Sequence, residues 1–183
     1  MQLSLEEGYI RDYQETDIAA LVQYANNRSI WKNLTDRFPH PYTDADAQAW
    51  LEFVQQQETP TYFAIATEEE LIGGIGFELQ TGIHCKTARL GYWLGEPFWG
   101  KGIVSEAVRA MTDYAFTHHD LERIYANVFE TNLAAVRVLE KGGFLYEARL
   151  RKHVFKDGKI LDLLIYAILR NEWQTKLKPS QPS

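Results

Sequence analysis

Residues 90–107 read LGYWLGEPFWGKGIVSEA. This stretch predicts a β-strand over residues 87–94, a loop through Gly100 and Gly102, and a helix over residues 104–118. Glycines allow such a loop to adopt positive φ and to approach a ligand closely. The free N–H groups of the loop and of the first helical turn, together with the helix dipole, favour phosphate binding. On loop composition alone, a ligand-free glycine turn is the alternative.

Two common nucleotide motifs do not fit this loop. Residues 95–101 match the G-x-x-x-x-G-K spacing of a P-loop, but Gly102 stands where Mg²⁺ coordination needs Ser or Thr. Phe98 and Trp99 are bulky where a P-loop backbone must wrap its phosphates. The chain also lacks a G-x-G-x-x-G fingerprint. The loop therefore predicts phosphate binding of another kind.

Periodicity on either side of the motif predicts an α+β fold. We expect strands at 9–13, 61–67, 71–79, 87–94, 123–129, 144–155 and 159–169, and helices at 18–25, 43–57, 104–118 and 133–141. Thr16 or Asp17 is expected to cap the first helix, and Thr43 with Asp46 has the spacing of a capping box. Residues 27–42 read as a long loop with one helical turn. This order predicts a mostly antiparallel sheet with one parallel crossover.

Bulk composition limits the classes of function. The chain has 183 residues and a net charge of −6, which argues against nucleic acid as the main partner. Cys85 is the only cysteine, so an internal disulfide and a cysteine-based zinc site are excluded, and we expect no metal. Residues 1–8 lack the features of a signal peptide and no apolar run is long enough for a membrane span, which favours a cytoplasmic protein without a membrane partner. We expect one domain over residues 1–175 and a disordered tail over 176–183.

The segments GYWL, WGKGIVSEA and NLAAVRVLEKGGF, in this order, resemble the GNAT acetyltransferase superfamily. Within it they are most similar to the RimJ/RimL branch of ribosomal-protein N-terminal acetyltransferases. The resemblance covers residues 9–173. It implies a three-layer fold with helices on both faces of a mixed sheet, in which a central parallel strand pair splays apart. It also implies transfer of acetyl from acetyl-CoA to a primary amine, by direct attack.

The resemblance implies a set of residues that hold the cofactor. Backbone groups of Tyr92, Trp93 and Leu94 would pair with pantetheine. The loop would give N–H groups to the pyrophosphate from Trp99, Gly100, Lys101, Gly102, Ile103 and Val104. Asn132 would contact the cofactor, with the N-cap of the next helix as its alternative role. Arg137 and Lys141 would face the phosphates, or lie on solvated surface.

Catalytic side chains do not transfer from the family. Arg89, Leu139 and Ala135 stand where relatives have a glutamate base, a tyrosine acid and a serine. The backbone N–H of Leu94 is expected to be the oxyanion donor. Glu78, on the neighbouring strand, is expected to orient or deprotonate the amine, with a solvent-facing carboxylate as the alternative.

The resemblance places the acceptor side of the cleft at residues 30–42, where Trp31, Asn33, Arg37 and Phe38 would line it. For the aromatic pair, the alternative is that they pin the loop to the core. Without an obvious base, an α-amine is favoured: about a tenth of it is neutral at pH 7, against about one part in 2,500 for lysine. A small-molecule amine such as a polyamine or antibiotic, and a CoA-binding module without catalysis, remain alternatives. The C-terminal hairpin edge favours a homodimer.

Overall fold

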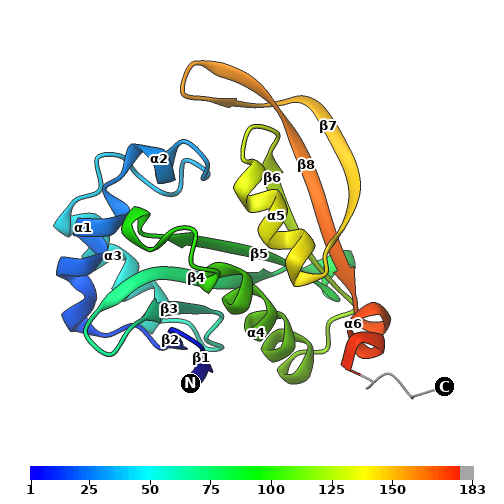
Figure 1. Ribbon diagram of the computed structural model, residues 1–183, viewed down its shortest axis with the longest axis horizontal. Coiled ribbons are helices and arrows are strands. Elements are labelled where there is room, and N and C mark those ends of the chain that lie inside the picture. The colour runs from blue at the N-terminus through cyan, green and yellow to red at the C-terminus, as the bar shows by residue number, and fades with distance from the viewer. Residues whose placement is uncertain (178–183) are drawn as a thin grey trace.

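The computed structural model describes residues 1–177, which form one eight-stranded sheet with helices on both faces (Figure 1). The strands are β1 (Gln2–Leu5), β2 (Gly8–Arg11), β3 (Tyr62–Ala66), β4 (Leu71–Leu79), β5 (Thr87–Leu94), β6 (Arg123–Phe129), β7 (Leu145–Lys156) and β8 (Lys159–Leu169). The helices are α1 (Ile18–Ala25), α2 (Arg28–Trp31), α3 (Asp44–Gln55), α4 (Ile103–His118), α5 (Leu133–Gly142) and α6 (Arg170–Leu177). Short 3-10 turns are η1 (Glu15–Asp17), η2 (Gly82–His84) and η3 (Glu96–Phe98).

The strand order in the sheet is β1-β2-β3-β4-β5-β6-β8-β7. Among the strands of residues 1–177, only β5 and β6 run parallel, and they pair over Thr87–Arg89 and Arg123–Tyr125. The pairing ends at Arg89 and Tyr125, and Figure 1 shows that β5 and β6 then part. The predicted mixed sheet with a central splayed parallel pair is therefore confirmed.

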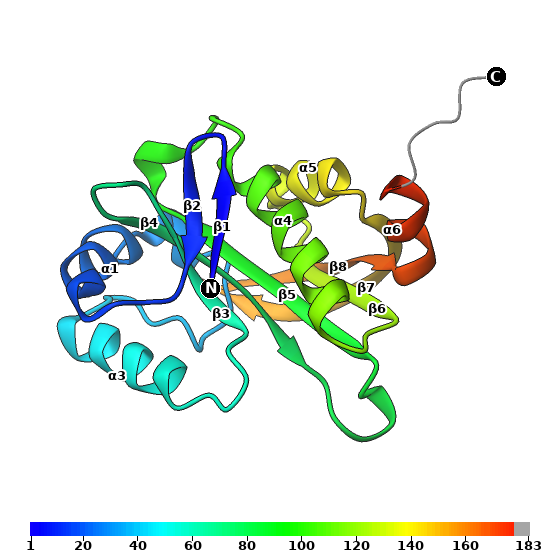
Figure 2. The ribbon, with the colours of Figure 1, turned by 90° about the horizontal axis from the view of Figure 1, so that it is seen from below.

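Two apolar clusters hold the layers together. The larger one joins the sheet to α4 and α5 through buried residues such as Phe77, Met111 and Leu139. The smaller one joins the opposite face to α1 and α3 through Leu21 and Leu51, among others. Figure 2 shows α1 and α3 on one side of the sheet and α4 and α5 on the other. Helices thus cover both faces, as the three-layer prediction requires.

Local capping signals in the sequence correctly mark several helix ends. Thr43 and Asp46 form the predicted capping box at the start of α3. The side chain of Asn132 accepts a hydrogen bond from the N–H of Ala135 and so caps α5. That helix ends at Gly143, whose φ of 89° is the left-handed conformation that glycine adopts without strain.

Asp17 does not cap α1 with its side chain, contrary to expectation. Its carboxylate instead accepts hydrogen bonds from both terminal nitrogens of Arg11, each at 2.7 Å. It also accepts one from the backbone N–H of Gln14 at 2.8 Å. Only 3% of Asp17 is exposed. A buried carboxylate is stable only when it is paired and hydrogen-bonded, which the guanidinium of Arg11 achieves better than one cap N–H.

The sequence did not predict β1 or α6. The first strand is four residues long and pairs only with β2, so its pattern is too short to read. Helix α6 is mostly polar, and its packing depends on Trp173, whose ring stacks on Phe116 at 5.1 Å. It runs to Leu177, so it includes the first two residues of the expected tail; residues 178–183 lie outside the described residues.

The hairpin of β7 and β8 bends over the sheet towards α2 (Figure 1). Its register shifts between Leu150 and Val154, and Lys152, with φ of 52°, lies in this bulge. Bulges bend and twist a strand, which directs the hairpin tip, residues 155–160, towards the N-terminal half. Strand β7 is an outer edge of the sheet; the dimer expected there stays a prediction.

Among residues 1–177, no helix has the length and apolar character that crossing a membrane would require.

Candidate active site

The backbone of β5 has one edge turned towards the splay. The backbone N–H of Gly95 donates to the carbonyl of Ile72 at 2.8 Å, and the backbone N–H of Gln80 donates to the carbonyl of Thr87 at 3.0 Å. These two bonds show which residues of β5 turn their backbone groups to β4. In an antiparallel pair, every second residue turns its N–H and C=O to the partner strand. Trp93 therefore faces β4, while Tyr92 and Leu94 face the splay. Of the three residues expected to pair with pantetheine, Tyr92 and Leu94 therefore have backbone groups that face the splay, and Trp93 does not.

The opposite wall of the splay is the backbone of β6. The backbone N–H of Arg170 donates to the carbonyl of Glu122 at 3.0 Å, and the backbone N–H of Glu130 donates to the carbonyl of Asp162 at 3.1 Å. The even-numbered residues of β6 therefore turn their backbone groups to β8. The odd-numbered residue Asn127 turns its backbone to the splay beyond the last paired residues. Two polar strand edges thus face each other without pairing. Backbone groups seek partners, and the amides of an extended pantetheine arm fit this requirement.

The glycine loop, residues 95–102, leads from β5 into α4. Gly100 and Gly102 have φ of 81° and 88°, and a Cβ on either would meet nothing within 4 Å. Gly102 is the N-cap of the 16-residue α4 and provides no side-chain cap. The N–H groups of the first turn, at Ile103 and Val104, are therefore available at the positive end of a long helix dipole. This geometry fits a pyrophosphate.

Trp99 is held to the end of β5. Its indole Nε1 donates to the carbonyl oxygen of Leu94 at 2.7 Å. The sequence placed Trp99 in the cofactor site only through its backbone, and no sequence signal indicates this side-chain contact. The bond fixes the peptide that follows Leu94, the residue whose N–H is the expected oxyanion donor.

Helix α5 borders the splay on the face of the sheet where the cofactor is expected. Its N-cap, Asn132, is confirmed in the capping role, and its cofactor contact stays a prediction. Arg137 and Lys141 are exposed on the same helix. The hydroxyl of Tyr92 crosses from β5 and donates to the carbonyl oxygen of Ala135, in the first turn of α5, at 3.3 Å. Burial raises the pKa of the Tyr92 phenol, so it remains a hydrogen-bond donor.

Glu78 lies on the other face of the sheet, where α1 and α3 pack. One oxygen of its carboxylate pairs with the guanidinium of Arg89, its cross-strand neighbour. The other oxygen lies 3.6 Å from Nη1 of Arg37. Since both oxygens face cations, Glu78 suits the orienting role better than the role of proton acceptor.

Gly91 leaves this face open at the splay. A Cβ built on it would meet nothing within 4 Å. Its neighbours on the same face of β5 are Arg89 and Trp93, and the ring of Trp93 contacts that of Phe38 at 5.7 Å. The space over Gly91 is therefore open and lies beside the rings of Trp93 and Phe38, next to the backbone of Tyr92.

The expected acceptor segment, residues 30–42, and the three residues before it, 27–29, are together called the acceptor loop. The hairpin tip reaches this loop. Trp31 lies beneath Lys156, whose Nζ is 4.0 Å from the ring centroid. The same Nζ donates to Asp36 at 2.7 Å, and Arg28 pairs with Asp157 at 2.8 Å. Only 3% of the Lys156 side chain is exposed. These contacts cover the loop and hold it to the hairpin.

The four residues expected to line the acceptor side thus separate into two pairs. Arg37 and Phe38 reach β4 and β5. Trp31 lies under the hairpin tip, and Asn33 donates its side-chain amide to the carbonyl of Ser29 at 2.9 Å, within the turn of α2. Arg37 and Phe38 are therefore the better placed to contact an acceptor.

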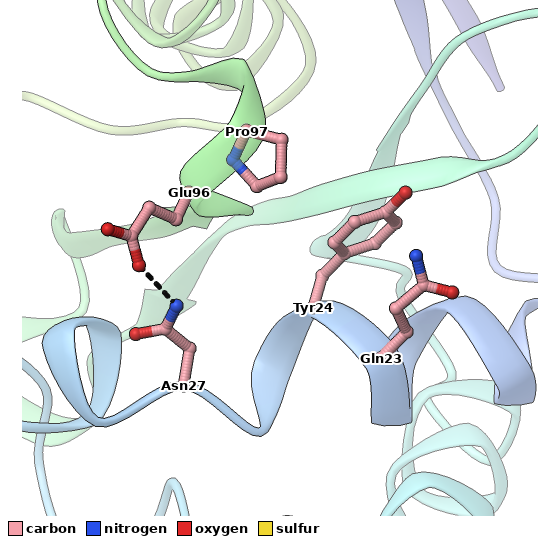
Figure 3. A pocket seen from close by; sticks show the side chains of 5 residues that line it. All are labelled: Gln23, Tyr24, Asn27, Glu96 and Pro97. Carbon is pink, nitrogen blue, oxygen red and sulfur yellow. Dashed lines mark hydrogen bonds between the residues drawn. The ribbon is translucent and has the colours of Figure 1, made fainter.

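A cavity of about 400 Å³ lies between α1 and η3, lined by Gln23, Tyr24, Asn27, Glu96 and Pro97 (Figure 3). Across it, the amide of Asn27 donates to Glu96 at 2.6 Å. The side-chain oxygen Oδ1 of Asn27 accepts a hydrogen bond from the N–H of Ser29 at 2.7 Å and so caps α2. One side chain therefore links the start of the acceptor loop to the start of the glycine loop.

Comparisons with known proteins agree with this geometry. Residues 9–145 match the sequence model of the family described as Acetyltransferase (GNAT) domain. An uncharacterised N-acetyltransferase, p20 of Bacillus licheniformis, is 30% identical over 93% of this chain and 97% of its own. The ribosomal-protein-serine acetyltransferase of Escherichia coli is 30% identical over 64% of this chain and 74% of its own.

A solved structure shares the fold as well. It is a spermidine N-acetyltransferase from Vibrio cholerae in complex with CoA and spermine, with a TM-score of 0.77 and 24% identity over 90% of this chain and 96% of that one. With the splay, the glycine loop and the family match together, the chain belongs to the GNAT acetyltransferase family, in its RimJ/RimL-like branch, and is an acetyl-CoA-dependent N-acetyltransferase.

Proposed function

We propose that this acetyltransferase acts on the α-amine at the N-terminus of a protein or peptide. The supporting observation is the charge around the expected acceptor side. The acceptor loop and the β7–β8 hairpin, residues 145–169, together carry eight Lys and Arg against four Asp and Glu. This local excess is opposite in sign to the net charge of −6 of the whole chain.

The acidic residues of these two segments all have cationic partners. Asp36 pairs with Lys156, Glu147 with Arg123, Asp157 with Arg28 and Asp162 with Arg149. A polyamine acceptor would need carboxylates that are free to receive its ammonium groups. The hairpin bulge instead lines a surface hollow of about 660 Å³ with residues 149–153, which include Arg149, Arg151, Lys152 and His153. These charges favour a peptide with acidic residues after its amine.

The chemistry of the amine supports the same acceptor. With both oxygens of Glu78 facing guanidinium groups, the described site offers no evident general base. An α-amine has a pKa of about 7.7–8.0 and needs little help to be neutral, whereas lysine at about 10.4 needs much more. The neutral amine attacks the thioester carbonyl directly, and the Leu94 N–H donates to the developing oxyanion. The identity shared with an E. coli ribosomal-protein acetyltransferase agrees with a protein acceptor.

Acetyl-CoA is bound with its pantetheine along Tyr92 and Leu94 and its pyrophosphate at residues 99–104. We infer a cytoplasmic location, which the single, exposed Cys85 fits, since a reducing compartment preserves a free thiol.

A panel of acceptors tests the proposal. Release of the CoA thiol is measured with four amines: a peptide with a free N-terminus followed by acidic residues, the same peptide with basic residues, an N-terminally blocked peptide with an internal lysine, and spermidine. We expect kcat/KM to be highest for the acidic free N-terminus. Spermidine or the internal lysine as best acceptor would overturn the proposal.

Charge reversal in the chain makes the test specific. Arg151→Glu, in the bulge, should narrow the preference for acidic over basic peptides. Lys86→Glu, which changes the same charge at the far end of β5 beside Asp120, should leave the preference as it is. Equal effects of the two variants would show that overall charge, and not the bulge, sets the preference.

A further inference from the structure

The Tyr92 side chain spans the distance between β5 and α5 beside the splay. Its hydroxyl donates to the carbonyl oxygen of Ala135 at 3.3 Å, which is longer than is usual for an O–H donor. Ala135 lies in the first turn of α5, where its carbonyl also belongs to the helical ladder. Loss of the Tyr92 bond therefore leaves this acceptor satisfied, and the hydroxyl can turn to another partner at low cost.

Acetyl transfer needs a donor where the thioester sulfur leaves. When the C–S bond breaks, its electron pair remains on sulfur, and a thiolate in a site that excludes water requires a hydrogen bond. The two positions of α5 where relatives have a hydroxyl group do not provide one here. Leu139 is fully buried, and Ala135 has only a methyl group. The hydroxyl of Tyr92 reaches the same first turn of α5 from the opposite side of the splay.

We propose that the Tyr92 hydroxyl donates a hydrogen bond to the sulfur of CoA as the thiolate leaves. The inference rests on the acetyl-CoA chemistry given above and is independent of the identity of the acceptor. The amine nitrogen bonds to the acetyl carbon, the C–S bond breaks with its electron pair on sulfur, and the proton lost by the nitrogen ends on sulfur or in solvent. Tyr92 keeps its own proton throughout.

Retention of that proton follows from the surroundings of the phenol. Burial raises the pKa of Tyr92, whereas a thiol has a pKa of about 8.5. Proton transfer from this phenol to a thiolate is therefore strongly uphill, and donation of a hydrogen bond is the stable arrangement. Tyr92 acts as an electrostatic stabiliser of the leaving group.

The thiol of bound CoA reports this contact without turnover. Its titration is followed by the ultraviolet absorbance of the thiolate, with the wild type and with Tyr92→Phe. We expect the bound thiol to titrate below free CoA in the wild type, and its pKa to rise by about one to two units in Tyr92→Phe. The kcat should fall about ten- to a hundredfold.

Tyr166→Phe is the matched control. Tyr166 also presents its hydroxyl to α5, but to Glu140 at 3.5 Å, near the other end of the helix. Its loss should leave the thiol pKa and the kcat unchanged. A second variant, Tyr92→Phe with Ala135→Ser, places a hydroxyl on α5 and should restore part of the lost effect.

The outcomes are distinguishable. Thermal stabilisation by CoA in Tyr92→Phe, together with a thiol pKa equal to that of the wild type, overturns the role of Tyr92 and leaves the cofactor site intact. A wild-type bound thiol that titrates like free CoA overturns it even if Tyr92→Phe does not fold. An absence of CoA binding in the wild type overturns the cofactor site itself and this inference with it.

Discussion

The indole N–H of Trp99 donates to the carbonyl oxygen of Leu94 at 2.7 Å, across η3, the short turn in the first half of the glycine loop. The same residue, Leu94, turns its N–H towards the splay, where the oxyanion is expected. A bond to its carbonyl restrains the end of the strand and therefore the direction of that N–H. We therefore expect Trp99, which is 45% exposed, to be a positioning residue for the cleft.

Trp99→Phe removes this bond and keeps an aromatic ring. One neutral hydrogen bond contributes about 0.5–1.5 kcal/mol, so we expect kcat/KM to fall about two- to tenfold with a small change in melting temperature. Trp173→Phe is the control, because it removes an indole bond from α6 to Asp113 of α4, away from the splay. Equal activity of wild type and Trp99→Phe would contradict the positioning role.

Gly91→Val tests whether the open space over Gly91 is used by the acceptor. The position has no strained φ and no neighbour within 4 Å of a Cβ, and valine favours strands, so we expect the fold to be retained. The added methyl groups would occupy space beside the expected position of the reacting amine, where a misplacement of 1 Å can lower activity about a hundredfold. Thermal shift with acetyl-CoA should be unchanged while kcat/KM for the acceptor falls by that order. A parallel loss of acetyl-CoA binding would show that Gly91 serves the cofactor.

Glu78→Gln separates orientation from proton transfer. The amide keeps the shape of the carboxylate and removes its charge beside Arg89 and Arg37. For an orienting group we expect the acceptor KM to rise about tenfold with kcat nearly unchanged; removal of a general base would instead lower kcat about 10²- to 10⁴-fold. Glu147→Gln, which loses a similar pair with Arg123, is the control.

The pH dependence of the rate should follow the acceptor alone. Burial raises the pKa of Tyr62 and Tyr92, and that of Tyr42 to about 12, so these phenols stay neutral when the pH rises to about 9. For a peptide α-amine, kcat/KM should rise through the amine pKa near 8 and then remain level. With a lysine acceptor the rise should continue to about pH 10. A fall between pH 8 and 9 with the α-amine would reveal a titrating group of the protein.

Much of the scaffold is predictable because its signals are local. The capping box of Thr43 and Asp46, the Asn132 cap and the positive φ of Gly143 each depend on a few adjacent residues. The glycine loop is of the same kind, since the φ values of Gly100 and Gly102 are conformations that the sequence GKG permits. Elements marked by such signals are found where the sequence placed them.

The side-chain contacts of the site are not predictable in this way. Tyr92 and Ala135 are separated by 43 residues, and only the parting of β5 from β6 brings them together. Lys156 reads as a surface charge in its own segment and becomes buried because the bulge at Lys152 bends β7 towards Trp31. Such contacts depend on the assembled sheet and not on neighbours in sequence.

Lys156 and Asp36 join segments 120 residues apart, and Arg28 and Asp157 add a second ion pair between the same two segments. The two pairs together limit how far the hairpin tip and the acceptor loop can separate. An acceptor that presents a chain end needs less separation than one whose chain continues on both sides of the reacting amine. On the proposed acceptor side, the double tie would therefore favour N-termini over internal lysines.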